Sequence, residues 1–166
     1  MKNIKFSRLF AAFAFVAILA LAGCKNQPEE SSKAIEGTWV SEAGEKYVIS
    51  GSDYDNYSRY DSNFVKHDDE WFLYYSTNNV EIVEIDSSSG YIYGQFDDEE
   101  HCGWNATVGQ WYAIYYFDLC DDAVKISQAA GEKGGCDTLE EAKETFTVEN
   151  GYMSKAAGKY STCAKE

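Results

Sequence analysis

The chain has 166 residues and a formal net charge of −14, from 28 acidic and 14 basic side chains. Its hydrophobic content of 45% is too high for a disordered chain. Its acidity argues against nucleic-acid binding, which needs clustered Lys and Arg. The length fits one domain, and a single proline with 16% aromatic residues indicates a small, aromatic-rich globular protein.

The first 23 residues differ from the rest of the chain. Lys2, Lys5 and Arg8 form a basic segment, and the uncharged apolar run Leu9–Ala22 follows it. As a helix, this run would span roughly 21 Å, which is short of the ~30 Å hydrocarbon core of a bilayer. We therefore predict that residues 1–23 are a secretory signal peptide and not a stable transmembrane helix.

The signal ends in Leu21-Ala22-Gly23-Cys24, which resembles the bacterial lipobox. The resemblance implies that the Cys24 thiol carries a diacylglyceryl group and that Cys24 becomes the new N-terminus. Acyl chains such as palmitate would then hold the protein on the lipid bilayer, since two or more chains give stable anchoring. The alternative is an ordinary signal peptide with a chance Cys.

Residues 24–34 are polar and contain the only proline, so we predict a flexible, lipidated tether. Lys25 stands where enterobacterial inner-membrane lipoproteins carry Asp, which favours the outer membrane, on its periplasmic face or at the cell surface. Cleavage would leave 11 basic against 28 acidic residues, a net charge of −17. A solvated acidic surface is the simplest reading, and attraction of a cationic partner is the alternative.

From residue 35 to about 130, short aromatic and β-branched runs alternate with Gly, Ser, Asn and Asp clusters, as strands and turns do. The spacing predicts an antiparallel meander. A turn is expected at Asn78-Asn79, and a change of phase between Val80 and Ile85 suggests a bulge. Strands are predicted over 35–42, 46–51, 54–60, 63–67, 70–76, 80–85, 91–96, 110–118 and 123–128, and near 159–163.

One helix interrupts this pattern. Thr138 and Glu141 form a capping box, and Leu139, Ala142 and Phe146 share one face of the helix that follows. We predict a structural helix over 138–146 that covers one end or side of the sheet.

Several strands carry aromatic residues on both faces. After the signal peptide, Tyr outnumbers Phe by 13 to 5. We therefore expect one face to form the core and the other to offer tyrosines to water or a ligand, in a wet cavity or at an aromatic surface. The candidate ligand-binding residues are Trp71, Tyr75, Tyr93, Trp111 and Tyr115.

The segment Glu36-Gly37-Thr38-Trp39 is similar to the Gly-x-Trp opening of lipocalin-like barrels, and the chain looks like small bacterial lipoproteins with such domains. The resemblance implies an all-β, lipocalin-like barrel of about 8–9 strands over 35–166, with one short helix near the C-terminus. By this resemblance, Gly37 lets the chain bend into the first strand, and the Trp39 side chain fills the closed end of the barrel. Lipocalins stack an Arg on this Trp, and here Lys159 is the expected substitute.

If Cys24 is lipidated, four cysteines are left. An even number in an exported chain predicts two disulfides. Counting strand crossings favours Cys102–Cys136 and Cys120–Cys163 among the three possible pairings. The long spacings do not fit a zinc site, and with only His67 and His101 as possible bases we do not expect Cys–His catalysis.

The acidic runs 68–70 and 97–100 are expected to be solvated loops. A calcium site is the functional alternative, but no EF-hand spacing accompanies these runs. No nucleotide-binding or hydrolase motif occurs either. We therefore predict no catalytic residues, no metal site and no cofactor.

Two functions are compatible with these observations. The first is a membrane-anchored, non-enzymatic binding module for a small apolar or aromatic ligand. The alternative is a surface interaction protein, or an inhibitor of a cationic secreted enzyme such as lysozyme. A cavity inside the barrel would favour the first function, and a filled barrel with an exposed aromatic and acidic patch would favour the second.

Overall fold

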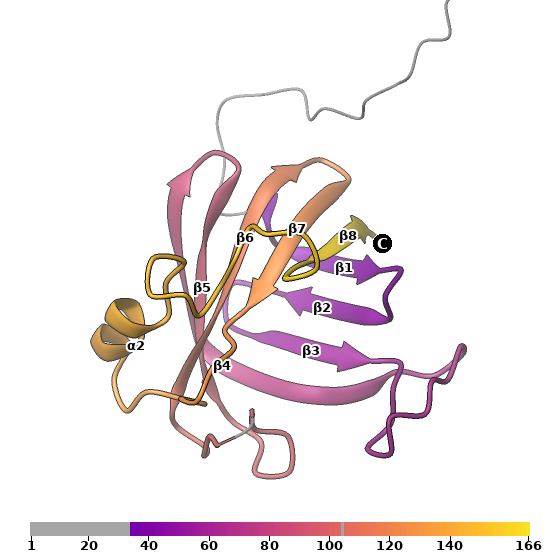
Figure 1. Cartoon of the computed structure of the whole chain (residues 1–166), viewed down its shortest axis with the longest axis horizontal. Helices are drawn as coiled ribbons and strands as arrows, with labels where there is room; N and C mark the ends of the chain where they lie inside the picture. Colours follow the sequence, from indigo (N-terminus) through magenta and orange to yellow (C-terminus); the bar gives the residue numbers. More distant parts are fainter. Residues whose placement is uncertain (1–33, 104) are drawn as a thin grey trace, which may run out of the picture.

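The computed structural model describes residues 34–103 and 105–166. These residues form a closed antiparallel barrel in which the strands follow one another in chain order and β8 pairs with β1 (Figure 1). The predicted all-β meander with one short helix near the C-terminus is confirmed. The signal peptide, the lipobox with Cys24 and the tether up to residue 33 lie outside the described residues. The elements are β1 (Gly37–Ser41), β2 (Glu45–Ile49), β3 (Tyr54–Ser58), β4 (Phe72–Asp86), β5 (Ser89–Phe96), β6 (Trp111–Cys120), β7 (Ala123–Gln128), α2 (Leu139–Thr145) and β8 (Ser161–Lys165).

Strand β4 differs from the prediction. Asn78-Asn79 is not a turn, because one strand runs through it and only the register with β5 shifts, between Asn78 and Glu81. Asn79 has φ = 52°, which Asn tolerates better than most residues. Its side-chain amide donates to Gln95 Oε1 at 2.8 Å, on the neighbouring strand. The two strands predicted over 70–76 and 80–85 are therefore one bulged strand.

The predicted strand over 63–67 is also wrong. A single bridge between Tyr60 and Lys66 closes a small hairpin within the β3–β4 loop, residues 59–71.

The inside of the barrel is filled with aromatic side chains. β5 makes room for two of them with glycine at inward positions. A Cβ on Gly90 would lie 2.6 Å from the Tyr116 hydroxyl, and one on Gly94 would lie 2.8 Å from the Tyr54 ring. Tight packing of this kind leaves little space for other atoms. The large inward aromatic residues are Trp39, Tyr47, Tyr54, Tyr75, Phe96, Tyr112 and Tyr116.

A second core lies outside the barrel wall, against β5 and β6. Helix α2 and the chain that follows it cross this outer surface (Figure 1). Phe146 and Met153 pack there, and the outward Tyr93 and Tyr115 are each only 2% exposed. The expectation of an aromatic surface or a wet cavity on one face is therefore wrong for these strands. Both faces are aromatic because both are buried, each in its own core.

Helix α2 begins as the sequence predicts. The Thr138 side chain accepts a hydrogen bond from the backbone N–H of Glu141 at 3.1 Å. The Glu141 carboxylate accepts from the N–H of Asp137 at 3.1 Å, one residue earlier than in an ideal capping box. Ala142 is the buried residue of the helix.

Trp39 is completely buried at the start of the barrel, as expected, and its indole N–H donates to the Ile35 carbonyl at 2.7 Å. The cation over its ring is Lys165 of β8, with Nζ 5.1 Å from the ring centroid. The prediction of Lys159 for this position is wrong, because Lys159 precedes β8 and is exposed. Gly37 has φ = 136°, a conformation that a side chain would strain.

The two ends of the barrel differ. In a meander, every odd-numbered strand runs toward the same end. β1 starts at the short-turn end, where turns of two to four residues join β2 to β3, β4 to β5 and β6 to β7. The opposite, long-loop end carries the β1–β2 turn, the β3–β4 loop, the β5–β6 loop (97–110) and the α2-containing connection (129–160) (Figure 1). The described chain therefore enters the barrel at the end opposite its long loops.

Within the described residues, no helix combines the length and the apolar character needed to cross a bilayer.

Candidate functional site

The predicted ligand-binding residues do not form one site. Tyr75 points into the barrel, where it is 1% exposed. Tyr93, Tyr115 and Trp111 belong to the outer core beneath α2 and the following chain. Trp71 lies apart from both groups, at the end of the β3–β4 loop.

Buried tyrosines pack the barrel interior. Tyr54, Tyr75 and Tyr116 are at most 1% exposed, and their hydroxyls have no hydrogen-bond partner. Burial raises the pKa of Tyr54 and Tyr75 well above the usual value for the phenol, so both stay neutral. These hydroxyls sit among packed rings; Tyr54 and Tyr75, for example, meet edge to face with centroids 5.9 Å apart.

At the long-loop end, a polar network joins three strands across the mouth of the barrel. The Gln128 amide donates to Glu45 Oε1 at 3.0 Å and to the Tyr47 hydroxyl at 2.8 Å. The Ser161 hydroxyl donates to the other oxygen of Glu45. The network ties β2, β7 and β8 together with paired polar groups at this end of the barrel.

The two predicted disulfides are not formed, since Cys102, Cys136 and Cys163 are free thiols. Cys102 packs against the inner core and Cys136 belongs to the outer core, so the barrel wall separates them. β7 lies between Cys120 and Cys163, because Cys120 pairs with Ala123 and β8 is one strand further on. Two strand spacings are about 10 Å, beyond the ~7 Å limit between the Cα atoms of a disulfide. The predicted pairing considers only the end of the barrel at which each cysteine lies. It does not consider the side of the wall on which the thiol lies, or that β7 separates Cys120 from Cys163.

The most distinctive exposed feature is the hairpin of residues 59–68, at the long-loop end. Its tip presents Phe64, which is 88% exposed, beside Val65 at 53% and Tyr60 at 41%. Phe64 has φ = 61°, an uncommon backbone conformation for a bulky residue.

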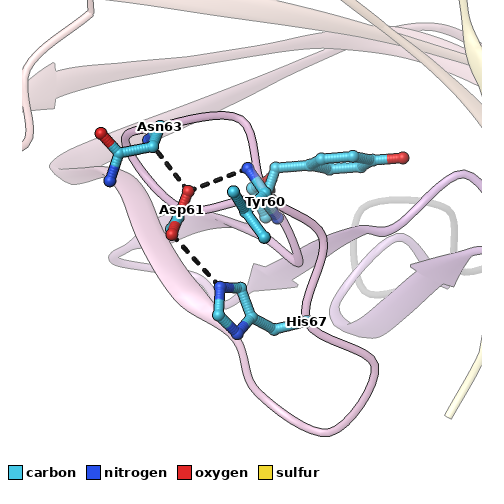
Figure 2. Close-up of polar contacts among 6 residues, drawn as sticks. Tyr60, Asp61, Asn63 and His67 are labelled. Carbon is cyan, nitrogen blue, oxygen red and sulfur yellow. Dashed lines mark hydrogen bonds and ion pairs between the residues drawn. The ribbon is translucent and has the colours of Figure 1, made fainter.

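Asp61 holds this tip in shape (Figure 2). One carboxylate oxygen accepts the backbone N–H of Asn63 and of Val65, each at 2.9 Å. The other oxygen contacts His67 Nε2 at 3.2 Å. These bonds, led by that from Val65, lower the pKa of Asp61, so the carboxylate stays ionised and the turn stays closed.

The base of the hairpin rests on aromatic rings. The Arg59 guanidinium lies 4.6 Å from the Trp71 ring centroid, and Lys46 Nζ of β2 lies 5.0 Å from it. The Arg59 side chain also donates to the Asp68 carbonyl. The His67 ring meets Phe72 of β4 with centroids 5.1 Å apart. Trp71 is thus the one predicted ligand candidate beside this hairpin, where it supports the base.

Acidic groups flank the hairpin. Asp68, Asp69 and Glu70 are exposed where the hairpin returns to β4. Lys66 Nζ lies 3.5 Å from the Asp68 carboxylate, a pair too exposed to contribute much stability. A surface groove of about 460 Å³ runs between the hairpin and β1, with Arg59, Lys66 and Lys165 among its lining residues.

The other acidic run, residues 97–100, lies in the β5–β6 loop as expected. Asp98 and His101 pair there at 3.0 Å, and this contact lowers the pKa of Asp98. No group of three or more His, Cys, Asp or Glu residues within 34–103 and 105–166 could hold a metal ion.

The sequence pattern predicts a turn at Asp61-Ser62 between paired strands over 54–60 and 63–67, and a turn does lie there, but the exposure of the tip is not predicted. The signal for that exposure is the pair of apolar residues Phe64-Val65 directly after the turn, which no alternation places on a buried face.

No family model, curated protein or solved structure matches this chain.

Proposed function

We propose that the protein is a bacterial lipoprotein, anchored through acylated Cys24 to a membrane that we take to be the outer membrane. Its barrel acts as an interaction module for another protein and has no enzymatic role. Binding of a small apolar ligand is the second candidate function.

The filled interior carries this proposal. A container for a small molecule normally needs a cavity of roughly 300–1,000 Å³ lined by side chains. Here aromatic rings from six of the strands occupy the inside of the barrel, and the Glu45–Gln128 hydrogen bond joins β2 and β7 at its long-loop end. Two hollows of about 460 and 470 Å³ lie around β1 and β8, where they are open to solvent.

The direction of the barrel supports the same conclusion. The described chain enters at the short-turn end, so a lipid on Cys24 would place the membrane on that side. The long loops would then point away from the bilayer, where a partner can reach them. A net charge of −17 after signal cleavage would favour a cationic partner and speed its approach.

The position of Lys165 over Trp39 supports the likeness to lipocalin-like barrels. A cation from the last strand stands where those barrels place their Arg, although Lys lacks the planar guanidinium.

Anchoring is tested by blocking the lipoprotein signal peptidase with globomycin, which should leave the precursor uncleaved in the membrane. The Cys24→Ser variant should lose the lipid and fail to be processed in the same way. Normal cleavage and normal membrane association of this variant would refute the lipoprotein assignment.

The two candidate functions are separated by a test for small-ligand binding, in which the full-length protein in nanodiscs is titrated with cis-parinaric acid and an anilinonaphthalene dye. We expect no saturable signal beyond that of empty nanodiscs. Saturable one-to-one binding would favour the ligand-carrying alternative.

A further inference from the structure

We infer that the hairpin of residues 59–68 is the contact element of a protein–protein interface, in which Phe64 enters an apolar pocket on a basic partner. This inference rests on the proposed function and names the binding site and the chemistry of the partner.

Exposed apolar side chains are concentrated at this hairpin. Six large apolar residues of the described chain are exposed, and Tyr60, Phe64 and Val65 of the hairpin make up half of them. Phe is normally among the most buried residue types. A single aromatic side chain that projects from a small protrusion has the form of an interface hot spot, which inserts into a pocket of its partner.

The hairpin is ordered before any partner binds. Asp61 accepts from the N–H groups of Asn63 and Val65, and the Phe64 N–H donates to the Asp61 carbonyl at 2.9 Å. The Asp61 N–H in turn donates to the Val65 carbonyl at 3.0 Å. Strained backbone that the surroundings hold in place is typical of binding sites, and a loop fixed in its bound shape loses less entropy on association.

Charge selects the class of partner. Residues 59–70 carry four acidic side chains, of which Asp68, Asp69 and Glu70 are exposed where the hairpin returns to β4, and two cations, Arg59 and Lys66. This excess of acidic groups favours a basic surface and opposes an anionic lipid headgroup. A second copy of this chain is opposed for the same reason, because each copy would carry a net charge of −17 after signal cleavage. The matching surface is therefore an apolar pocket bordered by Lys and Arg.

The test uses cyclic 12-residue peptides displayed on phage, selected against the full-length protein in nanodiscs. Such peptides converge on binding hot spots of a folded surface. The main variant is Phe64→Asn, which keeps the left-handed backbone conformation that Asn tolerates. Val108→Asn is the matched control, because Val108 is 45% exposed in a different loop of the same barrel end.

We expect the selected peptides to combine an apolar residue with two or more Lys or Arg. They should bind Phe64→Asn at least 30-fold more weakly than the unchanged protein, and Val108→Asn within threefold of it. The Asp61→Ala variant should weaken binding at least fivefold although Phe64 is retained, because the turn is no longer fixed.

Peptides that bind the Phe64→Asn variant with the same affinity as the unchanged protein would overturn the inference. Peptides that depend on Phe64 but are acidic or uncharged would overturn it too. A dimer in sedimentation velocity that Phe64→Asn dissociates would identify a second copy as the occupant and also overturn it. Peptides that converge on another loop would refute the hairpin but leave the proposed function standing. A ligand bound inside the barrel would instead refute the proposed function.

Discussion

Two neighbouring tyrosines inside the barrel allow a matched prediction. Removal of the hydroxyl oxygen should lower the free energy of unfolding at one position but not at the other. Tyr75 and Tyr112 lie side by side, with ring centroids 5.4 Å apart. The Tyr112 hydroxyl donates to the Ala129 carbonyl at 2.6 Å, whereas the Tyr75 hydroxyl is buried without a partner. Replacement of either residue by Phe deletes one oxygen and leaves the ring in place.

The expected magnitudes follow from these hydrogen bonds. A net hydrogen bond contributes about 0.5–1.5 kcal/mol, and its loss from Tyr112 also leaves a carbonyl without that donor. Tyr112→Phe should therefore lower the free energy of unfolding by about 1–2 kcal/mol. A buried hydroxyl without a partner costs roughly 1–3 kcal/mol, so Tyr75→Phe should be neutral or raise the free energy of unfolding by up to about 1 kcal/mol.

The two variants should differ by about 2 kcal/mol in urea denaturation followed by circular dichroism. For a domain of this size, this corresponds to a difference in Tm of roughly 8 °C. If both variants lost the same stability, the Tyr75 hydroxyl would have a polar partner and the interior would not be the dry, filled core described above.

Trp39→Ala should lower the free energy of unfolding by ~3–5 kcal/mol, because Trp39 is fully buried and bonded to Ile35; a loss below about 1 kcal/mol in the same denaturation assay would contradict its burial. Alkylation of the denatured, unreduced protein should modify Cys102, Cys136 and Cys163, and mass spectrometry that finds them blocked would show that they form disulfides after all. In the folded protein Cys163 should resist alkylation at pH 8, because burial and the nearby Glu45 raise the pKa of its thiol to about 12. Because the pKa of Asp61 is lowered, its bonds contribute their full stability above the ordinary Asp value of 3.8 and are lost as the pH falls through the lowered pKa. Nitrogen-15 relaxation at Val65 should therefore show more motion near pH 2 than at pH 5, and equal order at both values would contradict this role of Asp61.

The fold was predictable because its signals are local. Turn residues separate short runs of β-forming residues, and Thr138 marks the start of α2 through its own side chain. The change of phase after Val80 predicts the bulge in β4, but the Asn pair beside it equally favours a turn, which the structure does not have. Asn with a positive φ fits either structure, and only the pairing with β5 decides between them.

The assignment of faces could not be predicted in the same way. Alternation shows that residues 112 and 115 of β6 lie on opposite faces, but not that a segment some 30 residues later covers the outer one. The predicted disulfides were wrong for this reason, since Cys102 and Cys136 were assigned to an end of the barrel without a side of its wall. The hairpin tip escaped notice because the exposure of Phe64 depends on a turn geometry set by Asp61.

Native mass spectrometry of the full-length protein, extracted from the membranes of its own organism, distinguishes a barrel that binds another protein from one that carries a small ligand. We expect a protein that carries its lipid anchor, alone or with a second protein bound. The Phe64→Asn variant should be recovered without that second protein. A small molecule retained one-to-one inside the barrel would contradict the protein-binding role.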